Sequence, residues 1–424
     1  MDILMSLVGV VTLLIIAFLF SNGKKSINYR TVGGALAIQA AFGGFVLYVP
    51  IGQEVLGGVS MGVDNVIGYS QAGIDFLFGG LGTDAMSANG VGFVFAIRVL
   101  PVIIFFSSLI AVLYYLGIIQ LVIKFIGGGL QKALGTSRTE SMSATANIFV
   151  GQTEAPLIVR PFIATMTNSE LFAIMVGGLA SIAGSVLAGY AGMGVKIEYL
   201  VAASFMAAPG GLLMAKLMHP ETEKTNNNMD DLPEEIDKPA NVIDAAASGA
   251  ASGMHLALNV GAMLLAFVGL IAMLNGMIDG LGGLVGVENL TLELILGYIF
   301  MPLAFLIGVP WSEALVAGSF IGQKVIVNEF VAYLNFAPYL KDIADGGMVV
   351  AETGLAMTDR TKAIISFALC GFANLSSIAI LLGGLGTMAP SRRHDLAKLG
   401  VRAVIAASLA NLMSATLAGL FLAL

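Results

Sequence analysis

Three glutamates, Glu154, Glu313 and Glu329, stand inside apolar sequence that is long enough to be buried in a bilayer. A carboxylate at that depth costs roughly 2.5–3.5 kcal/mol on insertion scales, so each one needs a compensating partner. Ionised carboxylates accept hydrogen bonds from hydroxyl groups, which indicates binding of a hydroxyl-bearing ligand. The alternative is a glutamate that only bonds the backbone of its own turn, and we favour that alternative for Glu313.

Polar, glycine-bearing interruptions of the apolar sequence occur at corresponding places in the two halves of the chain. They are residues 151–155 and 178–184 in the first half, and residues 308–314 and 371–377 in the second. Paired interruptions of this kind point to a binding site at the interface of two repeats, near the middle of the membrane. We therefore expect a transported ligand to bind where the interruptions meet.

The side chains at the interruptions indicate the class of ligand. Residues 147–155, 177–190, 308–315 and 371–384 contain Glu, Gln, Asn, Thr and Ser but no Lys, Arg or His. An anionic ligand would require a cation there, whereas carboxylates and amides match the hydroxyl and amide-like groups of a neutral one. Sugars and nucleosides both qualify. A Phe372 ring that stacks on the ligand would favour a ligand with a flat ring. The alternative is that Phe372 only packs in the core.

The composition is that of a helical membrane protein. Of the 424 residues, 57% are hydrophobic and only 11% are charged. The net charge of −7 comes largely from residues 221–244, so it describes one acidic loop and gives no sign of a nucleic-acid partner. The single Cys370 and three scattered histidines exclude a thiolate metal cluster. No nucleophile or metalloprotease motif occurs at the interruptions, so we do not expect an enzyme.

The apolar segments predict eight membrane-spanning helices and two re-entrant helical hairpins in an all-α fold. The spans are expected at residues 2–20, 31–51, 91–123, 171–192, 198–218, 249–278, 362–385 and 401–424. An interfacial helix is predicted over residues 63–78. The first hairpin covers residues 141–162, and the second has arms at 292–309 and 314–336 with its tip at residues 310–313. The two hairpins enter from opposite sides, as in an inverted repeat.

Short basic loops give the orientation. Lys and Arg gather at residues 24–30, 124–138 and 392–402, and the predicted spans place all three stretches on one side of the membrane. Because short basic loops stay in the cytoplasm, that side is cytoplasmic and both termini are expected on the periplasmic side. The basic residues follow the first apolar run, which is not the order of a cleavable signal peptide.

Three motifs resemble those of the bacterial concentrative nucleoside transporters: residues 147–156, 328–333 and 371–377. The likeness extends over essentially the whole chain. It implies a homotrimer in the bacterial inner membrane, in which a mobile transport part of each subunit carries a nucleoside such as uridine past a scaffold. This elevator-like movement would be driven by symport of a cation, with no organic cofactor.

The resemblance also implies a division of the chain into parts. Residues 1–123 are mainly scaffold, 124–220 form the transport part of the first repeat, and 221–248 form an acidic cytoplasmic loop. Residues 249–280 form a long scaffold span, and 281–424 form the transport part of the second repeat.

The resemblance assigns roles to individual residues. Contacts to the nucleobase are implied for Gln152, Thr153, Glu154 and Val186. Contacts to the ribose are implied for Glu329, Phe372, Asn374 and Ser377. A sodium site is implied for the side chains of Asn147 and Ser181 and the carbonyls of Val150 and Ile182. An unwound helix beside a hairpin tip offers the oxygen ligands that a hard cation prefers.

Several alternatives stay open at this point. Some relatives couple to protons, although Asn147 and Ser181 match the sodium pattern. A cation-coupled carrier for another neutral polyol, such as a sugar, would use similar groups. A channel also uses polar re-entrant loops, but the two predicted hairpins differ in sequence and each lies beside a broken span. The preference between purine and pyrimidine nucleosides is not determined.

Overall fold

The computed structural model describes residues 2–82, 94–223, 225, 239–284, 286 and 289–424. This part of the chain is helical apart from one short antiparallel pair, β1 (Val349–Val350) and β2 (Leu355–Ala356). The first half contains α1 (Asp2–Leu19), α2 (Tyr29–Leu47), α3 (Pro50–Phe78), α5 (Phe95–Arg98), α6 (Leu100–Tyr115), α7 (Ile118–Leu134), α8 (Arg138–Ala146), α9 (Arg160–Ile163), α10 (Asn168–Ala180), α11 (Gly184–Gly192) and α12 (Ile197–Met218). The second half contains α13 (Val242–Leu284), α14 (Leu292–Leu306), α15 (Trp311–Ile326), α16 (Glu329–Leu340), α17 (Asp359–Leu369), α18 (Ser377–Met388) and α19 (Arg393–Phe421).

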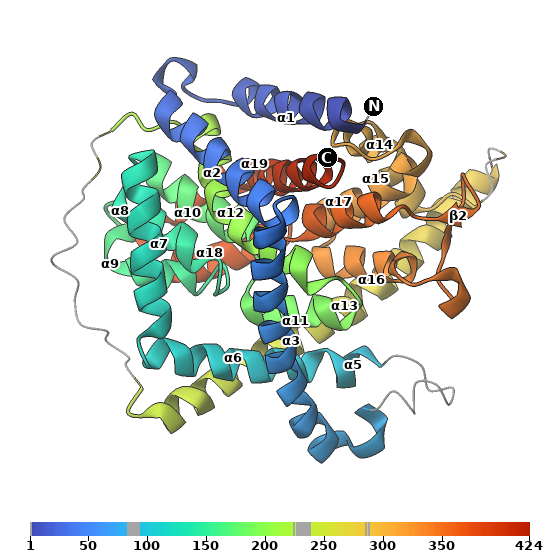
Figure 1. Ribbon diagram of the computed structural model, residues 1–424, viewed down its shortest axis with the longest axis horizontal. Helices are drawn as coiled ribbons and strands as arrows, with labels where there is room; N and C mark the ends of the chain where they lie inside the picture. The colour runs from blue at the N-terminus through green and yellow to red at the C-terminus, as the bar shows by residue number, and fades with distance from the viewer. Residues whose placement is uncertain (1, 83–93, 224, 226–238, 285, 287–288) are drawn as a thin grey trace.

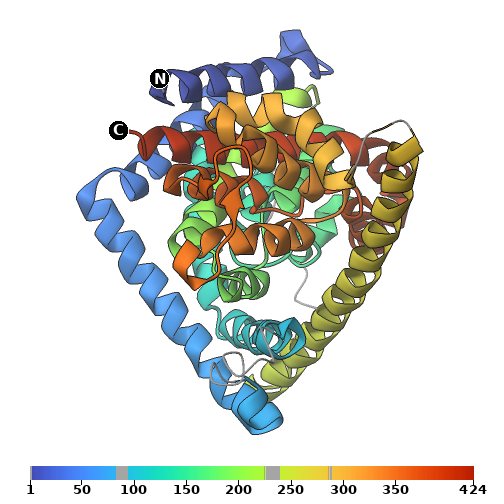
Figure 2. The same ribbon diagram turned by 90° about the vertical axis from the view of Figure 1, so that its right-hand side faces the viewer.

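Two long helices, α3 and α13, frame the molecule. In Figure 2 they run down either side and converge near α6, with the other helices packed between them. Helix α13 packs closely on α6 because Gly249 and Gly253 present no Cβ: one at Gly253 would lie 2.8 Å from the Cα of Ile104. Both long helices leave large apolar side chains exposed, such as Phe76 and Leu265. Their outer faces are therefore suited to lipid or to another subunit.

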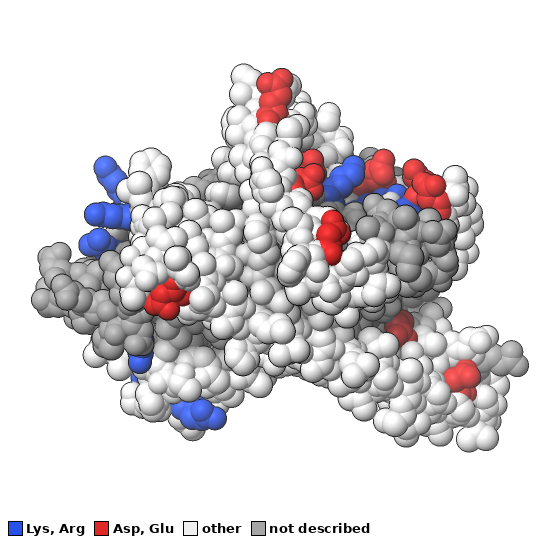
Figure 3. All heavy atoms as spheres, turned by 90° about the horizontal axis from the view of Figure 1, so that it is seen from below, with Lys and Arg blue, Asp and Glu red and all other residues white. Residues whose placement is uncertain are grey.

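The broken helix α10–α11 and the helix α12 form the centre of the body. In each of them 94% of the most apolar 18-residue window is buried inside the protein, against 17% for α13. A helix that is apolar all round and buried on every side belongs to the core of a large helical protein. In the view from below, charged side chains are few and separated by wide uncharged surface (Figure 3).

Six helices in the described part are long and apolar enough to cross a membrane. They run over Tyr29–Leu47, Phe95–Tyr115, Asn168–Gly192, Ile197–Met218, Val242–Leu284 and Pro390–Phe421, and they correspond to six of the eight predicted spans. The other two predicted spans correspond to α1, a shorter apolar helix, and to α17 with α18, which a break separates.

Several boundaries differ from the prediction. The span predicted over 31–51 ends at Leu47, and the helix predicted to begin at residue 63 begins at Pro50. The span predicted over 91–123 is divided at Gly117 between α6 and α7, and its residues 91–93 lie outside the described part. Helix α13 extends past both ends of the span predicted over 249–278.

The segment predicted as the second hairpin differs from the prediction. The chain does bend by 118° between α14 and α15, where the tip was placed. The arm predicted over residues 314–336 is wrong, however, because it breaks between α15 and α16 at Val327 and Asn328. Asn328 has an extended backbone, and its side chain accepts a hydrogen bond from the Val331 amide. It therefore ends one helix and caps the next, which places Glu329 at the start of α16.

Candidate functional site

The two broken helices meet at their breaks. The Phe372 amide, between α17 and α18, donates to the Ser181 carbonyl between α10 and α11 at 3.1 Å. Asn411 of α19 fastens both breaks, because its Nδ2 donates to the carbonyls of Ala180 at 2.6 Å and Cys370 at 2.9 Å. Gly371 allows this close approach, since a Cβ there would lie 2.8 Å from the Ala180 carbonyl oxygen.

A buried carboxylate lies beside the second break. Glu329 is 3% exposed, and its Oε2 accepts a hydrogen bond from Asn374 Nδ2 at 2.8 Å. Its Oε1 accepts one from the hydroxyl of Tyr190 in α11 at 3.2 Å. Asn374 in turn accepts from the Ser377 amide at 2.8 Å, which fixes the direction of its own amide group. The structure thus joins three residues of the predicted ribose set, and the positive end of the α16 dipole favours the carboxylate.

The segment that follows α8, predicted as the tip of the first hairpin, reaches this cluster through Gln152. Its Nε2 lies 3.5 Å from Ser377 Oγ, and its Oε1 is buried with no hydrogen-bond partner among the described residues. Thr153 contacts α18, where a Cβ on Gly384 would lie 2.8 Å from the Thr153 methyl group. Two residues of the predicted nucleobase set, Gln152 and Thr153, therefore lie beside the ribose set, although the two halves of the chain supply the two sets separately.

The remaining predicted substrate residues have different environments. Val186 is buried in α11 and Phe372 is partly buried. Glu154 is exposed and accepts a hydrogen bond from the Gly151 amide at 3.0 Å, within its own turn. Glu313, which we expected to act only on nearby backbone, accepts bonds from the amide and hydroxyl of Thr358 at 3.0 and 2.9 Å. It therefore caps the start of α17 from a distant part of the chain.

The predicted sodium residues lie where α8 and α10 end. Asn147 is 1% exposed, and its Nδ2 donates to the Ser143 carbonyl at 2.9 Å. Its Oδ1 is left buried with no donor in the described part of the chain. The Phe149 carbonyl accepts from the Gly184 amide at 3.1 Å, which joins this segment to the break that contains Ser181 and Ile182. A buried acceptor without a donor at the negative ends of two helices fits a cation.

Four further residues at this centre were missed in the sequence: Tyr190, Lys324, Asn328 and Asn411. Tyr190 and Asn328 fall within segments that we singled out. The partner of Tyr190, Glu329, lies 139 positions away along the chain, whereas Asn328 acts locally, as the cap of α16. Lys324 and Asn411 are polar residues inside apolar helices. The energetic argument that singled out the glutamates applies to them as well, and it would have found them.

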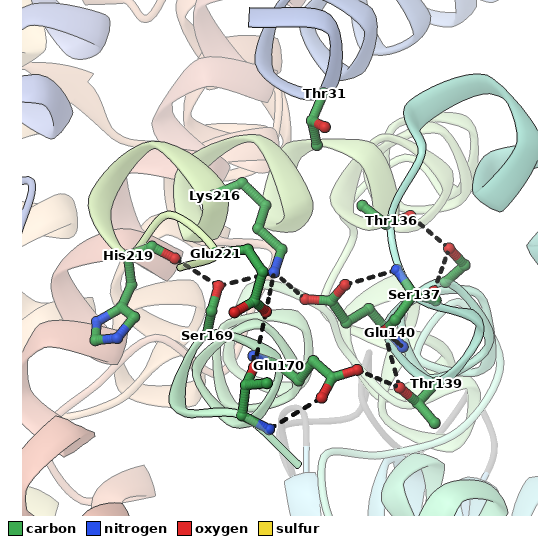
Figure 4. A network of polar contacts seen from close by, with 12 residues as sticks. Thr31, Thr136, Ser137, Thr139, Glu140, Ser169, Glu170, Lys216, His219 and Glu221 are labelled. Atoms are coloured by element: carbon green, nitrogen blue, oxygen red, sulfur yellow. Dashed lines mark hydrogen bonds and ion pairs between the residues drawn. The ribbon is translucent and has the colours of Figure 1, made fainter. Parts of the chain in front are cut away.

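A separate polar network fixes the starting ends of α8 and α10 (Figure 4). Each helix begins with a capping box, formed by Ser137 with Glu140 and by Thr167 with Glu170. Lys216 of α12 forms an ion pair with Glu140 and donates to Ser169 Oγ at 2.8 Å. The network lines a cavity of about 330 Å³. Because α8 and α10 end at the candidate site, their anchoring here positions the residues of the site.

His219 lies at the edge of the same network, just after α12. Burial lowers the pKa of its imidazole from the usual value, and the nearby charges of Arg402 and Lys216 lower it further. The ring is therefore neutral near pH 7, and its Nδ1 lies 3.0 Å from the side-chain nitrogen of Asn22.

Removal of the Lys216 charge is expected to destabilise the protein. The Lys216→Met substitution leaves the buried Glu140 carboxylate without its partner, and breaking a buried pair in this way costs about 3–5 kcal/mol. We expect a clearly lower midpoint of thermal unfolding in detergent. The double variant Lys216→Met, Glu140→Gln should recover much of the loss. A single variant as stable as the wild type would show that the pair contributes nothing.

Comparisons with known proteins agree with this arrangement. Family models match residues 199–419 (Na+ dependent nucleoside transporter C-terminus), 8–81 (the N-terminus of the same family) and 96–196 (a gate described as nucleoside recognition). An uncharacterized transporter of Haemophilus influenzae is 62% identical over 100% of this chain and 99% of its own length. The nucleoside permease NupC of Helicobacter pylori is 53% identical over 99% of this chain and 98% of its own.

The fold is also that of a solved transporter. CNTnw in an inward-facing substrate-bound state is 62% identical and superposes with a TM-score of 0.93, covering 99% of this chain and 98% of its own. Variants of CNTnw have been solved in outward-facing and intermediate states, and the two superpose on this chain with TM-scores of 0.95. Family models, full-length relatives and the fold agree, so this chain belongs to the Na+-dependent nucleoside transporter family, whose members are permeases and not enzymes.

Proposed function

We propose that this chain imports nucleosides such as uridine across the bacterial inner membrane by symport with sodium. The observation that carries the proposal is the meeting of Gln152 and Ser377 beside the Glu329–Asn374 pair, at the contact of two broken helices. The family is described as sodium-dependent, which supports sodium and gives no support to proton coupling. The nucleoside relatives likewise favour a nucleoside over a sugar.

The two groups of site residues suit the two parts of a nucleoside. Glu329, Asn374 and Ser377 would bind the ribose, because a carboxylate accepts hydrogen bonds from a pair of hydroxyls. The unpaired Oε1 of Gln152 would accept from a nucleobase amide or amino group. Thr153, Glu154 and Val186 would complete the nucleobase side, and Phe372 would form an apolar wall near the ribose.

Sodium would bind the side-chain oxygens of Asn147 and Ser181 and the carbonyls of Val150 and Ile182. Gln152 follows this segment directly, so the ion would hold the hairpin tip in the form that binds substrate. One sodium ion moving inward gains about 2.3 kcal/mol per 100 mV of membrane potential. At about 1.36 kcal/mol per tenfold change, this would concentrate a neutral nucleoside roughly fifty-fold.

The movement would be elevator-like, with residues 124–220 and 281–424 as the transport part. Helices α3, α6 and α13 would belong to the scaffold, and their exposed apolar faces support contact with lipid and with the other subunits of a homotrimer. The structures of CNTnw and its variants in outward-facing, intermediate and inward-facing states support alternating access. The start of α1 and the end of α19 lie close together in Figures 1 and 2, which supports termini on one side of the membrane. That side would be the periplasmic one, because short basic loops stay in the cytoplasm.

The sodium dependence of uridine binding tests the proposal. Because coupling energies between sites are typically 1–3 kcal/mol, we expect sodium to tighten uridine binding by about 5- to 150-fold over potassium. Calorimetric titration of the purified protein in matched sodium and potassium buffers measures the difference, with a hexose as the negative control. Equal affinity in the two buffers, or tighter binding of the hexose, would contradict the proposal.

A further inference from the structure

A buried cation lies at the centre of the second half of the chain. Lys324, in the last turn of α15, is 2% exposed. Its ammonium group donates to the Ala368 carbonyl at 2.9 Å and to Asn411 Oδ1 at 2.6 Å. Within the described residues, no carboxylate lies within ion-pair distance of it. Its two hydrogen-bond acceptors are oxygens of neutral groups, and the buried Glu329 carboxylate also acts on it electrostatically. Burial of an ammonium group is costly unless its surroundings compensate the charge.

The surroundings of Lys324 do compensate its charge. Helix α17 ends at Leu369, so Ala368 lies in its last turn, where carbonyl groups lack helical donors and the dipole is negative. The side-chain amide of Asn411 donates hydrogen bonds to the carbonyls of Ala180 and Cys370, at the ends of α10 and α17. Its Oδ1 accepts a hydrogen bond from Lys324. The ammonium group compensates the negative helix end and orients Asn411, which fastens the two breaks together.

The first half of the chain has the corresponding elements without a fixed cation. There α8 leads to the hairpin tip and α10 ends at the break, and the buried Oδ1 of Asn147 has no donor in the described part. In the second half, α15 leads to the break at Val327 and Asn328, and α17 ends at the break before α18. In the function proposed above, sodium binds at the end of α10 in the first half. At the end of α17 in the second half, the Lys324 ammonium group binds instead.

We propose that Lys324 is a tethered cation that occupies, in the second repeat, the place corresponding to the sodium ion in the first. It acts as a positioning residue for the ribose side of the site. The connection is direct: the Leu375 amide donates to the carbonyl of Val325, the next residue after Lys324, at 3.1 Å. Leu375 adjoins Asn374, so the charge that fixes the end of α15 also fixes the partner of Glu329.

Chemical rescue tests the inference. The Lys324→Ala substitution removes Cγ, Cδ, Cε and Nζ, and n-propylammonium has the same heavy atoms and charge. We expect the variant to bind uridine in sodium at least about ten-fold more weakly than the wild type, as for the loss of a hydrogen bond to a charged group. Added n-propylammonium should restore most of the affinity, whereas n-propanol, of the same size without charge, should not. The Lys324→Met variant, which fills the space, should also lose affinity.

The controls separate this inference from the proposed function on which it rests. Lys362→Ala removes a lysine from the other end of α17 and should bind like the wild type. Wild-type protein that fails to bind uridine in sodium would refute the proposed function. If the wild type binds uridine in sodium, three results would overturn only the role of Lys324. They are an unimpaired affinity of Lys324→Met, equal rescue of Lys324→Ala by n-propanol, and no rescue of Lys324→Ala by n-propylammonium. Failure of the Lys324→Ala protein to fold, both with and without n-propylammonium, also counts against the role of Lys324. A place shaped for a cation should accept the free ion and so permit folding.

Discussion

Replacement of Glu329 by glutamine is expected to weaken uridine binding by roughly 30-fold to several thousand-fold. The carboxylate is buried and accepts hydrogen bonds from Asn374 and Tyr190, so its oxygens point into the cluster that would hold the ribose. Loss of one partner from a buried, hydrogen-bonded charge pair costs about 2–5 kcal/mol, which corresponds to that range. The glutamine keeps the size of the side chain, so the protein should remain folded. Titration of uridine into the variant in sodium buffer gives the affinity.

The matched control is Glu313→Gln. Glu313 is also a buried glutamate of the second half, 4% exposed, but it caps α17 through Thr358, and its carboxylate forms no hydrogen bond with a site residue in the described part. It should lower the thermal stability and leave the uridine affinity unchanged. Uridine analogues that lack a ribose hydroxyl sharpen the comparison. The wild type should bind such an analogue more weakly than uridine, whereas Glu329→Gln should bind the two with similar affinity. Full affinity of Glu329→Gln for uridine would remove Glu329 from the ribose site.

The sequence was most informative about the breaks in the helices. Glycine and polar residues inside apolar segments cannot face lipid, so the segments at 147–155, 177–190 and 371–377 had to be buried against one another. The structure brings Gln152, Glu329, Asn374 and Ser377 together as that argument required. Six of the eight predicted spans correspond to helices of the described part that are long and apolar enough to cross a membrane, because those apolar runs have the length of a bilayer.

Local signals failed where distant contacts decide the structure. Pro310 and Gly308 mark a bend, and the bend is present, but the break beside Glu329 comes from capping by Asn328. Asparagine caps a helix or stays within it according to its tertiary surroundings, so its position alone does not reveal the break. The contact of Lys324 with Asn411 joins residues 87 positions apart, and no periodicity records such a pair.

Replacement of Asn147 by leucine is expected to raise the sodium concentration for half-maximal uridine binding by about 10- to 150-fold. The buried Oδ1 of Asn147 has no donor among the described residues, and leucine fills similar space without any oxygen. An interaction of this kind with a charged partner contributes about 1.5–3 kcal/mol, and a tenfold change is about 1.36 kcal/mol. Sodium titrations at fixed uridine concentration give the half-maximal value.

The sodium titration separates an ion ligand from a residue that only supports the fold. Gln39 is a suitable control, because it too is a buried amide whose Oε1 lacks a donor in the described part, and it bonds Ser414 instead of a residue of the break. Gln39→Leu should lower the unfolding temperature and leave the half-maximal sodium concentration unchanged. If Asn147→Leu also leaves that concentration unchanged, the ion does not bind at Asn147. The coupling argument would then fail with it, since that argument depends on the ion shaping the segment that carries Gln152.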